Sequence, residues 1–400
     1  MLFRGWRRRR GIGCRLSGAV ALCTLAAVPA AAAEFSVAPG QNVVGGLQRY
    51  VVKAGDVFPD IARRFDVGYT ALVAANPGVD PWGPGVGRAM TIPSVYVLPD
   101  APYRGVVINL GQWRLFYFPP GGDRVLTFPI GIGVIGWKTP LGTSRVVRKE
   151  ANPAWYPPPS VRAEHRAEGD DLPAVVPAGP DNPLGAFALY LGWPRYLVHG
   201  TNKPDGVGRN VSHGCIRLYP DDIEKLFAAV PIGTPVRVVN QPATAGWAGD
   251  RLYVQIHPSQ AQADEIDTEQ RVTPDPAQGV RPLVMAAAGT SADALDWDAV
   301  EKAARARIGI PVKVAERSAY AAAAPAAAPT YARGDTAPST EARSGYSYDP
   351  RLPERFDHLL QSLTRADRTD DRDAEEPYVQ PPQDPNRRTA TDPFRRGAGR

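Results

Sequence analysis

Between Gly105 and Asn240 the chain is a succession of short apolar and aromatic runs separated by glycine- and proline-rich joins. This pattern restricts the fold more than any other feature of the sequence. The runs lie at 106–110, 113–118, 125–130, 186–191, 196–198 and 234–239. Many short strands with turn-rich joins are typical of a sandwich or barrel. One helix is expected at 221–230, so the chain is predicted to be mainly β with small α+β modules.

Two smaller units flank this region. Residues 49–94 show the order strand, helix, helix, strand, with Ile61, Ala62 and Phe65 at helical spacing in the first helix. Residues 241–317 are expected to form an α+β unit, with strands at 251–257 and 310–314 around a helix at 292–308.

The remaining segments are expected to lie outside these folded units. Residues 34–48 are interpreted as a linker. From residue 318 to residue 400 the chain is rich in alanine and proline and then in mixed charge. Such a segment buries too little apolar surface to offset the entropy of ordering, so it is predicted to be a disordered tail.

Residues 1–33 have the pattern of an export signal. Six arginines and no acidic residue are followed by an apolar stretch and by small residues suited to cleavage before Glu34. The alternative, an uncleaved anchor, needs about 20 apolar residues, and the stretch from Ala19 to Val28 is shorter. Removing the segment changes the formal charge from +5 to 5 − 6 = −1. We therefore expect an exported protein of the periplasm or cell envelope, with no stable membrane insertion and no nucleic-acid partner.

The cysteine count isolates one residue. Of the three cysteines, Cys14 and Cys23 lie within the predicted signal, which leaves Cys215 alone in the exported chain. A single cysteine cannot form an internal disulfide, and a free thiol in an oxidising compartment calls for an explanation. It is either an inert buried thiol or a nucleophile.

The residues around Cys215 favour the nucleophile. The sequence Ser212-His213-Gly214-Cys215-Ile216-Arg217-Leu218 follows His199-Gly200-Thr201. A free thiol has a pKa of about 8.5, and a nearby imidazole and guanidinium stabilise the thiolate and shuttle its proton. The glycine lets backbone N–H groups face a developing oxyanion. Spacing alone does not say which histidine is the base.

Two other chemistries match parts of this pattern. His199, His213 and Cys215 are also possible zinc ligands, but no second cysteine or acid stands at ligand spacing, so no metal is expected. The GxGxxG pattern at 131–136 is followed by Lys138-Thr139-Pro140 and not by a helix start, so no dinucleotide and no other cofactor is expected.

The segment around Cys215 resembles the signature of the YkuD-type L,D-transpeptidases, and the resemblance covers residues 104–240. Their TPxG, NPxWxPP and GPxNPLG segments are matched at 139–142, 152–158 and 179–185. The resemblance implies a β-sandwich catalytic domain with Cys215 as nucleophile, His199 as base and the Gly200 carbonyl orienting its ring. His213, Gly214 and Cys215 match the oxyanion-hole backbone, Arg217 supports the loop and the thiolate, and Ser212 stands beside the centre. The donor stem is expected to be held by Trp155, Tyr156, Asn182 and Thr201.

Residues 49–94 resemble the LysM module, a βααβ unit that binds the glycan of cell walls. The residues that carry the resemblance are Tyr50, Val52, Gly55, Asp56, Ile61, Ala62, Phe65, Val67, Leu72, Ala75, Asn76, Ile92 and Pro93. The sequence departs from the LysM pattern at Phe58-Pro59 and in an insert at 80–86. A folded spacer without glycan affinity is the alternative.

Together the two resemblances imply an enzyme of peptidoglycan. Cys215 is expected to take a stem peptide as a thioester and to pass it to an amine on another stem, on a lipoprotein lysine or on a D-amino acid. Two alternatives stay open: an L,D-carboxypeptidase that passes the acyl group to water, and a peptidoglycan-binding protein whose enzyme domain is inactive. The sequence does not separate the transferase from the hydrolase, because pocket shape and water exclusion choose the acceptor.

Overall fold

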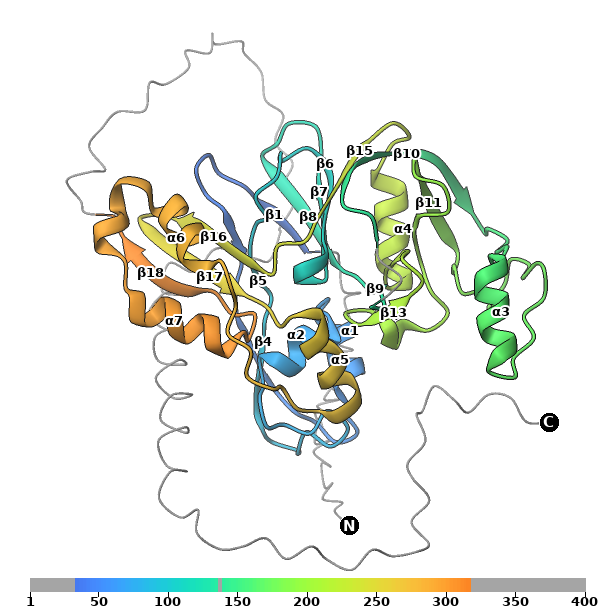
Figure 1. The fold of residues 1–400 in the computed structure, drawn as a ribbon, viewed down its shortest axis with the longest axis horizontal. Helices are drawn as coiled ribbons and strands as arrows, with labels where there is room; N and C mark the ends of the chain where they lie inside the picture. The colour runs from blue at the N-terminus through green and yellow to red at the C-terminus, as the bar shows by residue number, and fades with distance from the viewer. Residues whose placement is uncertain (1–32, 136–138, 318–400) are drawn as a thin grey trace, which may run out of the picture. The chain divides into compact units, whose positions relative to one another are not determined.

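The computed structural model describes residues 33–135 and 139–317 (Figure 1). The predicted signal, apart from its last residue, and the predicted tail lie outside the described residues. None of the helices in the described ranges has the length and hydrophobicity that a membrane span requires.

The LysM-like module has the predicted order of elements. These are β3 (Gln48–Val51), α1 (Phe58–Arg64), α2 (Tyr69–Ala74) and β4 (Ala89–Ile92), with β3 antiparallel to β4. Pro59 lies in the first turn of α1, where a missing N–H costs no helical hydrogen bond. Phe58, Ile61 and Leu72 are fully buried between the two helices and the paired strands β3 and β4. The departure from the LysM pattern at Phe58-Pro59 is therefore compatible with the fold.

The central unit is built on one curled sheet, which confirms the mainly β prediction. In spatial order its strands are β1 (Ala33–Ser36), β8 (Arg124–Pro129), β7 (Arg114–Phe118), β6 (Gly105–Asn109), β15 (Pro235–Val239), β10 (Gly142–Ala151), β11 (Phe187–Leu191), β12 (Leu197–His199) and β14 (Ile216–Arg217). Neighbours are antiparallel except β15 with β6 and β12 with β14, which are parallel.

Strand β10 bends the sheet and brings its two ends together. Its residues 142–145 pair with β15, whereas residues 146–151 pair with β11, with a register shift between Val146 and Arg148. Such irregularities increase local twist and turn a strand. At the far end, Gly131 and Arg217 exchange two backbone hydrogen bonds of 2.8 and 2.9 Å, so the last strand lies beside the chain that leaves β8.

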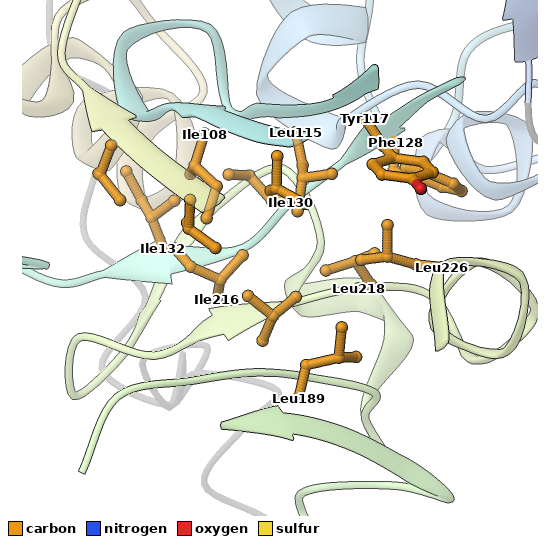
Figure 2. Close-up of a cluster of buried hydrophobic side chains, with 14 of the residues drawn as sticks. Ile108, Leu115, Tyr117, Phe128, Ile130, Ile132, Leu189, Ile216, Leu218 and Leu226 are labelled. Atoms are coloured by element: carbon orange, nitrogen blue, oxygen red, sulfur yellow. The ribbon is translucent and has the colours of Figure 1, made fainter. Parts of the chain in front are cut away.

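The apolar core fills the space inside the curl. Figure 2 shows Ile108, Leu115 and Phe128 from one part of the sheet facing Ile216 and Leu218 from the other. Helix α4 (Pro220–Ala229) adds Ile223 and Leu226 to the same cluster. Each such fully buried side chain contributes about 1.5–3 kcal/mol. This packing of two apolar faces is what a sandwich requires.

The segment 34–48 is not a linker, and that prediction was wrong. It holds β1, which pairs with β8, and β2 (Val43–Gly45), which pairs with β5 (Val95–Val97). Phe35 and Val37 pack against the cluster that contains Phe116. Strand β8 would otherwise present an unpaired edge, so the preceding chain completes the sheet.

The C-terminal unit is a three-stranded antiparallel sheet of β16 (Ala243–Ala248), β17 (Arg251–Ile256) and β18 (Val312–Glu316), packed against helices. Helices α6 (Val280–Ala288) and α7 (Trp297–Ala306) pack on this sheet, whereas α5 (Gln260–Glu269) places Ala263 in the core of the central unit and Ile266 in that of the LysM-like module. Helix α7 begins at Trp297 and not at the predicted residue 292, because the Asp296 carboxylate accepts the Ala299 N–H at 2.9 Å and caps it. Helices α5 and α6 were not predicted.

Candidate active site

Cys215 lies in the turn that joins β13 (Asn210–Ser212) to β14, and it is the free cysteine of the described chain. Gly214 precedes it with a φ of +100°, a conformation that a side chain disfavours. Ser212 fixes this turn, since its hydroxyl donates to the Cys215 carbonyl at 2.6 Å and accepts from the Gly214 N–H at 3.2 Å. The contribution of Ser212, which the sequence left undefined, is therefore to hold the turn together.

The parallel pairing of β12 and β14 gathers three candidate site residues on one face. Val198 pairs with Ile216, and both are buried in the core. Because successive side chains of a strand alternate between faces, His199, Cys215 and Arg217 lie on the opposite face. Cys215 directly precedes β14 and stands two residues before Arg217, the residue paired with His199.

His199 is held as a neutral ring. It is 4% exposed, and burial followed by the nearby Arg217 charge lowers its pKa to about 3. Backbone hydrogen bonds with Gly200 and Leu184 only partly oppose this shift. The Nδ1 atom lies 2.6 Å from the Gly200 carbonyl oxygen. A neutral imidazole that donates from Nδ1 leaves a lone pair on Nε2, which is the form a general base needs.

The Cys215 thiol is also neutral at rest. It is half-buried and donates to the Arg195 carbonyl at 3.5 Å. Burial raises the pKa of Cys215, while a backbone hydrogen bond with Leu197 and the Arg217 charge act in the lowering direction. The expectation that flanking groups favour the thiolate therefore holds for Arg217 in direction, but burial has the larger effect. A base that takes the proton from the thiol is therefore needed to form the thiolate.

Thr139 connects a second motif to this turn. Its hydroxyl donates to the Gly214 carbonyl at 2.8 Å, and the side chain is buried. The TPxG segment had been singled out by resemblance alone, and this contact supplies a physical reason for its threonine. Sequence reasoning had not named Thr139 as a site residue.

His213 points away from the thiol face. Its Nε2 lies 2.9 Å from a carboxylate oxygen of Glu164 in α3 (Pro159–Ala167), a helix that projects beyond β10 and β11 (Figure 1). Within the described ranges, no group of three histidine, cysteine, aspartate or glutamate side chains is placed to hold a metal ion. The geometry therefore favours His199 over His213 as the base.

The four residues expected to hold the donor stem differ in exposure: two reach the surface and two are buried. Tyr156 is 69% exposed, and Trp155 is half-buried, its backbone exchanging two hydrogen bonds of 2.8 Å with Val176. Asn182 is 1% exposed, and its amide donates to the Pro153 carbonyl at 2.9 Å.

Asn182 and Thr201 do not fit direct contact with a substrate, which corrects the expectation for both. The Asn182 side chain also accepts a hydrogen bond from the Leu184 N–H at 2.8 Å. Both its amide nitrogen and its amide oxygen are therefore engaged in hydrogen bonds within its own loop. The buried Thr201 hydroxyl accepts the Lys203 N–H at 2.9 Å in a local turn. Trp155 and Tyr156 remain the candidates for contact with the stem.

An exposed aromatic ring marks the LysM-like module. Trp82 is 46% exposed and lies in the insert at 80–86 that departs from the LysM pattern. The insert is ordered by two hydrogen bonds, from the Trp82 N–H to Asp80 at 2.9 Å and from the Phe58 N–H to the Pro81 carbonyl at 2.8 Å. Sequence analysis had not named this tryptophan, although its place in an insert of turn residues was the available signal.

Comparison with known proteins gives matches over most of the chain. The L,D-transpeptidase catalytic domain named YkuD matches residues 103–238, and the LysM domain matches residues 50–93. The chain is 42% identical over 296 residues to the probable L,D-transpeptidase YcfS of Escherichia coli strain K12, covering 72% of this chain and 90% of that protein. It is 39% identical over 280 residues to the probable L,D-transpeptidase YbiS of the same strain, covering 69% and 89%. A solved structure of an L,D-transpeptidase from Mycobacterium tuberculosis H37Rv aligns over 39% of this chain and 64% of that chain, at 23% identity and a TM-score of 0.26.

Proposed function

The chain belongs to the L,D-transpeptidase family, and from this premise we propose that it acts on peptidoglycan stem peptides through a thioester on Cys215. Residues 1–33 export the protein to the periplasm, 49–94 bind glycan and 104–240 carry out the reaction. Residues 241–317 form an accessory unit. Peptidoglycan is the partner, and no cofactor takes part.

The first half of the reaction forms the acyl-enzyme. Nε2 of His199 takes the thiol proton, and the Cys215 sulfur attacks the carbonyl carbon of the third residue of a tetrapeptide stem. The C–N bond to the terminal D-alanine breaks, and the imidazolium returns the proton to the leaving amine. The developing oxyanion is stabilised by the backbone N–H groups of His213 and Cys215, because Ser212 already engages the Gly214 N–H.

The second half transfers the acyl group. An amine attacks the thioester carbonyl carbon and His199 accepts its proton; the C–S bond breaks, and the imidazolium returns the proton to the Cys215 sulfur. With a second stem as acceptor, the product is a 3→3 cross-link; a lipoprotein lysine or a D-amino acid gives the corresponding amide. The thioester conserves the energy of the amide that was broken, so the cycle needs no nucleotide.

The observation that supports this proposal best is the shared face of β12 and β14. It brings a lone thiol, a neutral imidazole with its Nδ1 hydrogen bonded, and a guanidinium together within one parallel strand pair. An inactive binding protein would not need this combination. Water as the acyl acceptor, which would make the protein an L,D-carboxypeptidase, uses the same groups and is the second candidate.

Mass spectrometry of muropeptides tests the proposal. Purified protein incubated with tetrapeptide-rich peptidoglycan is expected to yield dimers linked 3→3, and Cys215→Ala is expected to yield none. Tripeptides without dimers would instead establish the carboxypeptidase. A wild-type digest identical to that of Cys215→Ala would refute both enzymatic functions and leave a wall-binding protein.

A further inference from the structure

The LysM-like module contacts the segment that carries Cys215 at both ends of that segment. At its start, the Tyr69 N–H donates to the Val207 carbonyl at 3.4 Å and the Thr70 N–H donates to the Gly208 carbonyl at 3.3 Å. At its end, the Tyr219 hydroxyl donates to the Val67 carbonyl at 3.3 Å. The LysM-like module therefore contacts this segment both before and after the turn that carries Cys215.

The contact at the start of the segment supplies hydrogen-bond acceptors to the first N–H groups of helix α2. Helix α2 is preceded by Gly68, which has no side chain to cap the first N–H groups. Unpaired N–H groups at a helix start need acceptors. The carbonyls of Val207 and Gly208 provide them, so the helix and the loop depend on each other for their hydrogen bonds.

Two glycines make this approach possible. Gly208 has a φ of +83°, and a Cβ atom placed on it would lie 2.3 Å from the Tyr69 nitrogen and 2.4 Å from the Gly68 Cα. Beside them the Arg209 guanidinium lies 3.6 Å from the centre of the Tyr69 ring. No side chain fits between the module and the loop at Gly208.

The turn that leads into this contact also supports Arg217. A Cβ atom placed on Gly206 would lie 2.8 Å from Nη1 of Arg217, so the guanidinium packs directly on the loop backbone. The Arg217 backbone is fixed in turn by its hydrogen bonds with Gly131. The Nε of Arg217 is buried without a hydrogen-bond partner in the described part of the chain, so packing holds this side chain where it acts on Cys215.

We propose that the LysM-like module is a positioning element of the active site, in which Gly208 and Tyr219 are the positioning residues that keep Arg217 beside Cys215. The proposal rests on the proposed function only in taking Cys215 as the reacting thiol. The module therefore has a role besides attachment to the wall: the charge that promotes ionisation of the thiol depends on contacts made by a separate, glycan-binding unit.

The experiment compares two test variants with two matched controls in the full chain. Gly208→Ala places a methyl group against the module, whereas Gly233→Ala carries the same conformational cost, at a φ of +89°, with nothing within 4 Å of the added atom. Tyr219→Phe removes the hydroxyl bonded to the module. Tyr117→Phe removes a hydroxyl that donates at 3.0 Å to a carbonyl within the catalytic unit.

The readout is the pH profile of alkylation of Cys215 by iodoacetamide, followed on its own peptide by mass spectrometry so that Cys14 and Cys23 do not contribute. Displacing the guanidinium is expected to raise the midpoint of the profile by roughly one pH unit, about a tenfold slower reaction below the midpoint. Alkylation needs no stem peptide, so the result is independent of whether the enzyme cross-links.

Both test variants are expected to shift upward while both controls follow the wild type. A Tyr219→Phe profile superimposed on that of Tyr117→Phe would overturn the proposal, even if Gly208→Ala failed to fold. So would a lowered melting temperature in Gly208→Ala without any change of its profile, because the contact would then contribute stability alone.

Discussion

Replacement of Arg217 by glutamine isolates the electrostatic part of the site. Arg217 acts on both partners: it lowers the pKa of Cys215 by stabilising the thiolate and lowers the pKa of His199 by repelling the imidazolium. An opposite charge within about 4–6 Å changes a pKa by about 1–3 units, and each unit corresponds to about 1.4 kcal/mol. Without the charge, the pKa of Cys215 is expected to rise by that amount, and the pKa of His199 is expected to rise toward its ordinary value of 6.5.

The assay is alkylation of Cys215 by iodoacetamide as a function of pH. Below its midpoint the rate follows the thiolate fraction, so Arg217→Gln is expected to react about 10- to 1,000-fold more slowly than wild type at a given pH. Arg237, an exposed arginine of β15, provides the control, and Arg237→Gln is expected to leave the profile unchanged. Arg217→Lys keeps the charge and is expected to recover part of the shift. A midpoint in Arg217→Gln at or below that of wild type would refute the electrostatic reasoning.

Three further predictions address the base, the turn and the glycan. His199→Gln removes the proposed acceptor of the thiol proton and is expected to lower acyl transfer by about 10²- to 10⁴-fold in the muropeptide assay, whereas His165→Gln, at a half-buried ring paired with Asp170, is expected to leave it unchanged. Thr139→Val breaks the hydrogen bond to the active-site turn and is expected to cost about 1 kcal/mol in chemical denaturation; an unchanged midpoint would show that the bond contributes nothing. Trp82→Ala is expected to weaken retention on purified sacculi without changing alkylation of Cys215, and undiminished retention would exclude the ring from glycan binding.

Much of the fold could be predicted because its strands are marked by composition and separated by turn residues. The pairing of β12 with β14 could not, since nothing in either short strand specifies a parallel partner and the choice is made by the core that Val198 and Ile216 share. The strand at Ala33–Ser36 was missed for a related reason. Its role depends on the open edge of β8, a feature of the assembled sheet.

The site was predictable in its residue types and less so in their roles. A motif places Asn182 and Thr201 near the reaction, but asparagine and threonine side chains hold loops as readily as they bind substrates, and only burial decides between these uses. The ionisation state of Cys215 could not be predicted from the sequence either. The sequence shows the arginine that favours the thiolate and not the burial that opposes it.

The neutral state of both partners suits a free thiol in the oxidising compartment to which we propose the protein is exported. Oxidation and disulfide exchange proceed through the thiolate, so burial that raises the pKa of Cys215 protects the enzyme between turnovers. The same burial keeps the imidazole of His199 unprotonated and ready to accept a proton over the whole physiological range, since its pKa of about 3 lies far below it. In the proposed reaction both groups are required at once: the thiol ionises only as His199 takes its proton, with Arg217 stabilising the charge that appears on sulfur. Any substitution that opened the site to water would therefore act in two opposite ways, making the resting thiol easier to ionise and also easier to oxidise.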